Sequence, residues 1–181
     1  MNSYIAFVPA RSGSKRLPNK NIKLLLGKPL IVWTLQALIN LNEVKEVILS
    51  TDSEYYFEVA NKFITNPKLK LDLRSADDAG DSIKIFDYLI KYFDKNLISK
   101  YENMIMCLPT CPLRKSSHIQ EAINLFISRN KAVFSACEYN FPISFAFNTP
   151  AQGGWNPVFK DNPMKTGNTR SQDQEKFYRP N

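Results

Sequence analysis

Residues that bind transition metals or form disulfides are scarce in this sequence. It holds one histidine, His118, and three cysteines, Cys107, Cys111 and Cys137. A structural zinc site needs four cysteine or histidine ligands, usually in closely spaced pairs, and no second pair accompanies Cys107 and Cys111. An odd number of cysteines also cannot form a closed disulfide framework. We therefore expect no zinc site, and we interpret the cysteines as the reduced thiols of a cytoplasmic protein.

Long apolar runs are missing as well. No segment approaches the ~20 apolar residues that a membrane-spanning helix needs. The first residues, MNSYIAFVPARSG, lack the basic region of a signal peptide, and their apolar run is too short for one. We therefore expect neither a spanning segment nor a membrane partner.

Acidic residues are absent before Glu43. The same acid-free stretch holds six of the cations that give the chain its formal net charge of +7: Arg11, Lys15, Arg16, Lys20, Lys23 and Lys28. A cluster confined to one stretch favours a small anionic ligand such as a nucleoside triphosphate. A surface for nucleic acid would repeat its cations along the chain, with aromatic residues between them, so no nucleic-acid partner is expected. The alternative is a set of solvated lysines without a ligand.

Strands and helices alternate along most of the chain. Short apolar runs bounded by turn-forming residues predict strands at 5–8, 46–51, 69–73, 103–108 and 132–139. Segments with helical spacing predict helices at 29–41, 53–65, 81–95 and 116–129. This order predicts an α/β fold with a mainly parallel sheet and helices on both faces.

Three details of the packing follow from the same patterns. In the helix at 81–95, one stripe is expected to face the core; it consists of Ile83, Phe86, Ile90 and Phe93. Trp33 is also expected in the core. Ser117 and Gln120 have the spacing of a capping box at the start of their helix.

The length of 181 residues predicts a single domain, 1–181. After residue 140 the sequence becomes rich in proline, asparagine, glycine and aromatic residues and loses its periodicity. We therefore expect 140–181 to be an irregular segment that covers the edge of the sheet.

The cationic stretch directly follows the first predicted strand. In parallel α/β sheets, ligands bind beyond the carboxyl ends of the strands, so both this loop and 109–114 are expected at the binding edge. A turn of small residues, with Gly13 serving the turn, can direct backbone N–H groups at an anion. Arginine adds bidentate phosphate contacts and lysine a movable charge. The loop matches neither a Walker A motif nor G-x-G-x-x-G, so the residues indicate nucleotide binding without naming the nucleotide.

Five segments occur in the order of the motifs of one family: VPARSGSKRLPNKN (8–21), LSTDSE (49–54), LRSADDAGDS (73–82), LPTCPLR (108–114) and TRSQDQEKFYRPN (169–181). With them the sequence resembles the CMP-sialic acid synthetases, or acylneuraminate cytidylyltransferases, whose first motif typically reads I-P-A-R-x-G-S-K-x-L-P-x-K-N. The resemblance implies a three-layer α/β/α nucleotidyltransferase fold of the nucleotide-diphospho-sugar transferase type. It also implies a dimeric enzyme that transfers CMP from CTP to the anomeric hydroxyl of a sialic acid-like nine-carbon keto sugar acid. Pyrophosphate is released, and Mg²⁺ is required.

Carried over motif by motif, the resemblance implies three groups of site residues. The catalytic group, which orients the nucleotide and holds its β- and γ-phosphates, is Arg11, Lys15 and Lys20. The nucleotide-binding group is Ala10, Arg11, Ser12, Gly13, Asn21, Arg74, Asp81, Ser82, Pro109 and Thr110. The sugar-binding group is Arg170, Gln172 and Arg179, with Asn181 closing the site. No general base is assigned, and His118 is interpreted as a surface residue.

Several of these positions also have purely structural interpretations. Asp52, at the end of a strand, is expected only to cap the next helix. Arg74 is interpreted either as a neighbour of the cytosine or as an ion-pair partner of Asp77 or Asp78. Arg114 is interpreted either as structural or as a substrate contact.

Three departures from the family pattern bear on the sugar and on the metal. Leu108 stands where many members have glutamine, and Ser171 where many have a second arginine, which leaves the sugar open. The family continues past R-P-N to an acidic D-x-D motif that binds Mg²⁺, and nothing in 1–181 matches that motif. We therefore expect a truncated chain without metal ligands.

Three alternative functions remain open. The first is a cytidylyltransferase for pseudaminic, legionaminic or an eight-carbon keto acid, or an enzyme that uses another base. The second is a CTP-binding domain without turnover. The third is a nucleic-acid-binding protein, which would show steeply salt-dependent association with oligonucleotides.

Overall fold

The computed structural model describes residues 3–80, 83–96, 101 and 103–180. The chain divides into two compact units, Met1–Asn124 and Leu125–Asn181, and each is described by itself. The predicted role of 140–181 as a cover for the sheet edge, and the single domain to which it belongs, therefore stay predictions. Among the described residues, no helix combines the length and the apolar character needed to cross a membrane.

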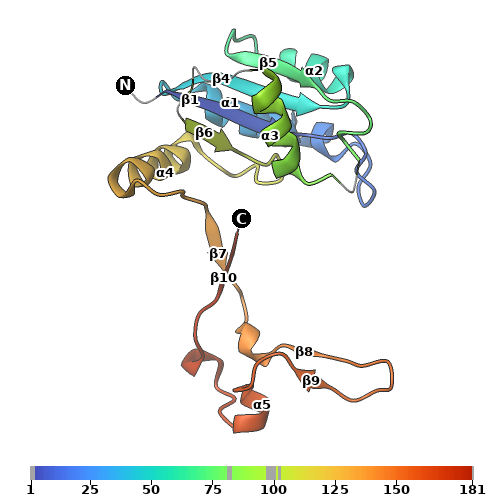
Figure 1. Cartoon of the computed structure of the whole chain (residues 1–181), viewed down its shortest axis with the longest axis vertical. Coiled ribbons are helices and arrows are strands. Elements are labelled where there is room, and N and C mark those ends of the chain that lie inside the picture. Colours follow the sequence, from blue (N-terminus) through green and yellow to red (C-terminus); the bar gives the residue numbers. More distant parts are fainter. Residues whose placement is uncertain (1–2, 81–82, 97–100, 102, 181) are drawn as a thin grey trace. The chain divides into compact units, whose positions relative to one another are not determined.

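A four-stranded parallel sheet forms the centre of the first unit (Figure 1). Its order is β5 (Leu69–Leu73), β4 (Val44–Thr51), β1 (Tyr4–Pro9) and β6 (Asn103–Met106). Every neighbouring pair in this sheet is parallel. In β1, residues 4–8 are all buried, as expected for an apolar strand covered on both faces. The predicted α/β fold with a parallel sheet is confirmed.

Helices cover both faces of this sheet, which gives three layers (Figure 1). Side chains alternate along β1, so Ile5 and Phe7 point to one face, where they pack with Tyr88 and Leu89 of α3 (Ile85–Asn96). The other face is covered by α1 (Leu30–Ile39), which buries seven of its ten residues. Two further helices follow β4 and β6, namely α2 (Glu54–Asn61) and α4 (Ser116–Arg129).

Short elements connect β1 to α1. The 3-10 helix η1 (Lys20–Ile22) is followed by a hairpin of β2 (Leu24–Leu25) and β3 (Lys28–Pro29). Trp33 is only partly buried, and its Nε1 donates to the carbonyl of Leu25 over 3.1 Å. The expectation that Trp33 is a core residue is therefore wrong, because its indole N–H fastens the hairpin to α1 at the edge of the core.

The apolar stripe predicted for α3 is wrong as well. Phe86 and Ile90 are each 63% exposed, and Ile83 is 43% exposed. Tyr88 and Leu89 are buried instead, with Ile85 and Tyr92 packed beside them. Both sets of residues have helical spacing, so periodicity alone does not decide which set meets the sheet. The side chain of Phe93 lies outside the described residues.

The predicted capping box of α4 does not form. The helix begins at Ser116, whose Oγ donates to the carbonyl of Ala37 over 2.8 Å. Gln120 Nε2 donates to Glu43 Oε1 over 3.1 Å rather than turning back to the helix start. These side chains therefore tie α4 to α1 and to the loop before β4.

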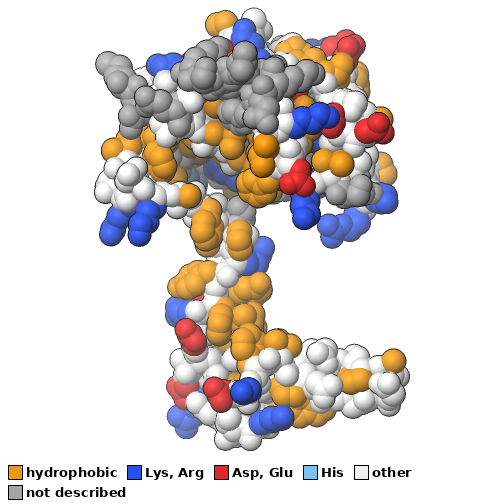
Figure 2. Space-filling view, in the orientation of Figure 1, with side chains coloured by type: hydrophobic (Ala, Val, Ile, Leu, Met, Phe, Trp, Pro, Cys, Tyr) orange, Lys and Arg blue, Asp and Glu red, His pale blue; other side chains and the backbone are white. Residues whose placement is uncertain are grey.

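The second unit is built from short elements. Its antiparallel pair is β7 (Ala136–Glu138) with β10 (Tyr178–Pro180), and a second pair is β8 (Phe147–Asn148) with β9 (Asn156–Pro157). Between the strands lie η2 (Ile143–Phe145), α5 (Pro163–Thr166) and η3 (Ser171–Asp173). Apolar side chains lie at its surface (Figure 2), among them Phe141, Phe147, Trp155, Val158 and Tyr178.

The predicted fifth strand, 132–139, does not belong to the parallel sheet. The observed strand, β7, has three residues and pairs with β10. Ala136 and Glu138 are exposed, and Cys137 is only partly buried. A strand inside a parallel sheet would be covered on both faces, so the exposure of β7 agrees with its place in a separate two-stranded ribbon.

Candidate functional site

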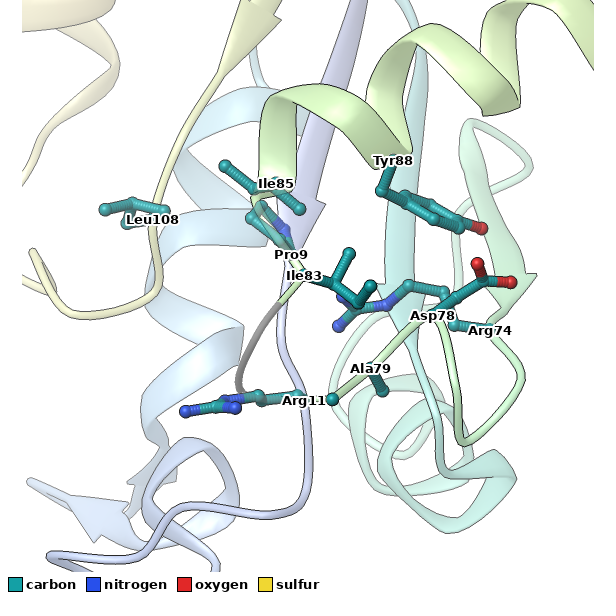
Figure 3. Close-up of a pocket in the computed structure, with 10 residues that line it drawn as sticks. Pro9, Arg11, Arg74, Asp78, Ala79, Ile83, Ile85, Tyr88 and Leu108 are labelled. Atoms are coloured by element: carbon teal, nitrogen blue, oxygen red, sulfur yellow. The ribbon is translucent and has the colours of Figure 1, made fainter.

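A pocket of 270 Å³ lies at the carboxyl end of the parallel strands (Figure 3). It is lined by residues at or after the ends of β1, β5 and β6 and by residues before and within the first turn of α3: Pro9, Arg11, Arg74, Asp78, Ala79, Gly80, Ile83, Ile85, Tyr88 and Leu108. Two of these residues are arginines, and the walls also include apolar side chains, an aromatic ring and one carboxylate. This mixture suits a flat, polar ring that is attached to an anionic group.

The chain enters the cationic loop along a fixed path. Ala10 is fully buried, and its N–H donates to the carbonyl of Ser50 over 2.8 Å. Asn21 is 5% exposed, and its Nδ2 donates to the carbonyl of Arg11 over 3.0 Å. Asn21 therefore braces the backbone at Arg11, while the Arg11 side chain lines the pocket.

Asp52 binds the same loop from the end of β4. Its Oδ1 accepts from Ser12 N–H over 2.7 Å, and its Oδ2 accepts from Ser12 Oγ over 2.8 Å. The expectation that Asp52 caps α2 is wrong. The N-cap residue is Ser53, which makes no capping hydrogen bond through its side chain. Asp52 is instead a brace for the first turn of the loop.

Gly13 does not have the backbone conformation that favours glycine. The left-handed residue of the loop is Asn19, at φ 54, and its Oδ1 accepts from Tyr56 OH over 3.3 Å. A Cβ added at Gly13 would meet no atom within 4 Å. The expectation that Gly13 serves the turn is therefore wrong. The side of Gly13 on which a Cβ would stand is open space.

The predicted phosphate-binding lysines lie on the same loop but outside the lining of the pocket. Lys15 is exposed, and Lys20 is partly buried at the start of η1. Arg11 and Arg74 are the two predicted residues that the structure brings together at the pocket.

Arg74 is held by the backbone of β4 and by an aromatic ring. Its N–H donates to the carbonyl of Thr51 over 2.8 Å, and its Nη2 donates to the carbonyl of Ser50 over 3.3 Å. Its guanidinium lies 5.5 Å from the centre of the Tyr88 ring. Burial lowers the pKa of Arg74, and the nearby charge of Asp52 opposes that shift. The alternative pairing with Asp77 or Asp78 is not observed within the described residues, and Asp78 pairs with Lys91 over 2.6 Å.

A carboxylate lies behind Arg74, on β5. Asp72 Oδ2 accepts from Ser50 Oγ over 2.6 Å and from Tyr88 OH over 2.8 Å, and Oδ1 is 2.9 Å from the same hydroxyl. Burial raises the pKa of Tyr88, and the bond to Asp72 raises it further, so the phenol stays protonated as a donor.

The segment after β6 adds one wall. Leu108 lines the pocket and is 40% exposed. Pro109 is buried and Thr110 is exposed, and neither is part of the lining. Arg114 Nη1 donates to the carbonyl of Leu108 over 3.3 Å. Of its two expected roles, structural or substrate contact, this bond favours the structural one.

The remaining predicted residues lie elsewhere. Asp81, Ser82 and Asn181 fall outside the described residues. The three predicted sugar-binding residues belong to the second unit, where Arg170 precedes η3, Gln172 lies within it and Arg179 lies in β10; all are exposed.

A metal site is not formed by the described residues, where no group of three or more His, Cys, Asp or Glu side chains could hold an ion. The carboxylates nearest the pocket are engaged as well: Asp52 by Ser12, Asp72 by Ser50 and Tyr88, and Asp78 by Ser75 and Lys91. His118 is an exposed residue whose Nδ1 accepts from Lys115 N–H over 3.4 Å, in agreement with its interpretation as a surface residue.

Sequence reasoning missed the part that three residues play in the site: Asp52, which was interpreted only as a helix cap, Asp72 and Tyr88. The two aspartates were detectable, because polar side chains at the carboxyl end of parallel strands meet at the binding edge. Tyr88 was hidden by the competing apolar stripe of α3.

The chain is similar to proteins of one family over nearly its whole length. The family profile described as cytidylyltransferase matches residues 5–179. The pseudaminic acid cytidylyltransferase of Campylobacter jejuni is 34% identical over 176 residues, which are 96% of this chain and 73% of that protein. The N-acylneuraminate cytidylyltransferase of Escherichia coli O18:K1:H7 is 36% identical over 140 residues, or 76% of this chain and 32% of that protein. The CMP-N,N'-diacetyllegionaminic acid synthase of Legionella pneumophila is 31% identical over 82% of this chain and 64% of that protein.

Solved structures share the fold. A CMP-2-keto-3-deoxy-manno-octonic acid synthetase, solved in complex with CTP, matches with a TM-score of 0.66 at 15% identity, over 99% of this chain and 72% of that one. A 4-diphosphocytidyl-2C-methyl-D-erythritol synthase from Anaerococcus prevotii matches with a TM-score of 0.63 at 17% identity, over 99% of this chain and 68% of that one. The predicted nucleotidyltransferase fold is thereby confirmed.

Proposed function

The chain belongs to the cytidylyltransferase family, and on that premise we propose that it transfers CMP from CTP to the anomeric hydroxyl of a nine-carbon keto sugar acid. The observation that carries the proposal is the meeting of Arg11 and Arg74 in one pocket at the carboxyl edge of the sheet. Arg74 lies beside the apolar and aromatic walls that suit a pyrimidine ring. Arg11 opens the cationic loop that suits the triphosphate.

The proposed reaction is the one that the family resemblance implies. The sugar hydroxyl attacks the α-phosphorus of CTP in line with the departing group and gives up its proton as the new P–O bond forms. The bond between the α-phosphorus and the bridging oxygen breaks, and pyrophosphate leaves. Arg11 orients the nucleotide, while Lys15 and Lys20 offset the negative charge that develops on the pyrophosphate.

The requirement for Mg²⁺ remains an expectation about the reaction. The described residues do not fit a metal site of their own, since the carboxylates at the pocket are already hydrogen-bonded. No step is assigned to the ion. The chain's own part is to bind the nucleotide with Arg11, Lys15, Lys20 and Arg74.

The acceptor is proposed by chemical class. The three relatives carry the names of N-acylneuraminate, pseudaminic acid and legionaminic acid enzymes, and all three compounds are nine-carbon keto sugar acids. Leu108 lines the pocket that is assigned to the base, so it does not choose between these acceptors. N-acetylneuraminic acid and pseudaminic acid are the two leading candidates, because N-acylneuraminate and pseudaminic acid enzymes are both among the similar proteins. Arg170, Gln172 and Arg179 are proposed as contacts of the sugar acid.

The test is pyrophosphate release from CTP in the presence of Mg²⁺ and each of the three nine-carbon acids in turn. An eight-carbon keto acid serves as the matched control for chain length. We expect release with at least one nine-carbon acid and a CMP-sugar of the corresponding mass. Release with the eight-carbon acid alone, or with none of the four, would contradict the proposal.

A further inference from the structure

A buried polar network lies directly behind the pocket. The Asp72 carboxylate takes hydrogen bonds from Ser50 Oγ and from Tyr88 OH, over 2.6 and 2.8 Å. These three residues come from β5, β4 and α3, so the network joins two strands of the sheet to the helix above them. The reaction proposed above does not use this network.

The network fixes the ring of Tyr88. Besides its bond to Asp72, Tyr88 packs against Phe7 and Tyr92, with ring centres 6.4 and 6.3 Å away. The Arg74 guanidinium lies over the ring, 5.5 Å from its centre, and its Nη2 donates to the carbonyl of Ser50. Figure 3 shows the Arg74 side chain running past the Tyr88 ring into the pocket. The ring therefore sets where the guanidinium lies.

Arg74 also carries a donor without an acceptor. The residue is 8% exposed, and its Nε is buried with no hydrogen-bond partner among the described residues. A buried donor left unpaired is destabilising. The guanidinium of the same residue lines the pocket, which makes Arg74 the side chain through which the pocket recognises its occupant.

An arginine offers only donors, and this limits which base it can recognise. The edge of cytosine presents two neighbouring acceptors, O2 and N3. In uracil, N3 carries a hydrogen and becomes a donor, which would face the donors of the guanidinium. A site built on such a contact discriminates strongly against the analogue that lacks it, because its polar groups are then left unpaired.

We propose that Tyr88 is a positioning residue for nucleotide selection: its hydrogen bond to Asp72 holds the ring beside Arg74 and so keeps the guanidinium aimed at the acceptor edge of cytosine. This inference rests on the proposed function, in which the pocket takes the base of CTP. Tyr88 also occupies one donor site of the Asp72 carboxylate. Without the phenol, that carboxylate would attract the guanidinium and draw it out of the pocket.

The test is a calorimetric comparison of CTP and UTP binding by the 181-residue protein and by Tyr88→Phe. This substitution keeps the ring and removes only the bond to Asp72. We expect the affinity for CTP to fall about tenfold, the change that corresponds to the loss of one well-placed hydrogen bond. We expect the affinity for UTP to change less than about twofold, so the ratio of the two affinities falls.

Two further variants separate positioning from mere stability. Tyr4→Phe removes a buried hydroxyl at the opposite end of β1 and should leave the CTP/UTP ratio unchanged, whatever it does to the melting temperature. Arg74→Met should remove the preference for CTP, so that the ratio of the CTP and UTP affinities approaches one. Adding Tyr88→Phe to Arg74→Met should not lower it further, because Tyr88 acts through Arg74.

The outcomes are distinct. If the unmodified protein binds CTP no better than UTP, the proposed function itself is contradicted. If it prefers CTP and Tyr88→Phe retains the preference, or lowers both affinities equally, the positioning role of Tyr88 is wrong while the proposed function stands. That role is also wrong if the effect of Tyr88→Phe persists in the Arg74→Met background.

Discussion

Single residues give the cationic loop its shape, and Asp52 is the clearest case. Ser12 uses both its backbone N–H and its hydroxyl on this one carboxylate. A hydrogen bond to a charged group contributes about 1.5–3 kcal/mol net to stability. The loop that carries Arg11, Lys15 and Lys20 is therefore fixed by an acidic residue from the neighbouring strand.

Asp52→Asn should lower the free energy of unfolding by about 1–2 kcal/mol, because an amide offers Ser12 one acceptor instead of two and removes the charge. Urea denaturation measures this change. Glu58→Gln makes the same chemical change at an exposed position of α2 and should stay within about 0.5 kcal/mol. Equal effects of the two variants would show that Asp52 does not brace the loop.

Substitution by alanine should lower the stability at one glycine of the first unit and weaken CTP binding at another. Gly27 has φ +79, where a Cβ is strained, so Gly27→Ala should destabilise the fold by about 1 kcal/mol. Gly13 has neither a left-handed φ nor a neighbour within 4 Å. Gly13→Ala should leave the stability unchanged and weaken CTP binding, because the open side of Gly13 is where a phosphate would approach the backbone.

Thermal melts and CTP titrations of both variants check this prediction. A Gly13→Ala protein that binds CTP normally would place the phosphates elsewhere.

At this scale the sequence predicted Arg11 and Arg74 as site residues, and the structure places both at the pocket. It gave Asp52 another role and did not single out Asp72, because their hydrogen-bond partners come from other elements of the fold: Ser12 for Asp52, and Ser50 and Tyr88 for Asp72.

Among the elements, α3 has most influence on the site. It supplies Ile85 and Tyr88 to the pocket and covers one face of the sheet. Its sequence contains two apolar stripes, and the one that carries Tyr88 and Leu89 faces the sheet. Two elements were predicted with the bounds that the structure shows, β5 at 69–73 and α4 at 116–129. Both lie between clear turn signals, whereas the orientation of α3 depends on tertiary packing.

Neighbouring residues of α3 test this orientation directly. Leu89 is 3% exposed and Ile90 is 63% exposed. Leu89→Ala should cost about 2–5 kcal/mol of stability, because it leaves a cavity against the sheet. Ile90→Ala should cost less than about 1 kcal/mol, since little of its side chain is buried. Chemical denaturation compares the two variants, and a larger loss for Ile90→Ala would mean that the helix faces the other way.

For the molecule as a whole, the distribution of charge matters more than its total. Six cations lie before the first acidic residue, and their loop follows the central strand β1. The sequence predicted this arrangement because apolar strands and charge clusters are local features. It did not predict that β7 and β10 form a ribbon in a second unit, since that pairing joins residues about forty positions apart.

A ligand held by clustered charges should bind more weakly as salt rises. CTP affinity should fall at least about fivefold between 50 and 500 mM NaCl, because screening weakens its contacts with exposed lysines. Cytidine, which lacks the phosphates, should bind weakly and with little salt dependence. Titrations at several salt concentrations measure both. A single-stranded oligonucleotide that bound more tightly than CTP, with a steeper salt dependence, would favour the nucleic-acid alternative instead.

The most direct test of the central claim is a calorimetric titration of the 181-residue protein with CTP, UTP, ATP and GTP at moderate salt with Mg²⁺. If the pocket beside β1 holds cytosine and the loop holds the triphosphate, CTP binds most tightly of the four, and Arg11→Ala weakens its binding at least about tenfold. Equal affinities for the four nucleotides, binding to none of them, or an Arg11→Ala protein that binds CTP normally would contradict the claim.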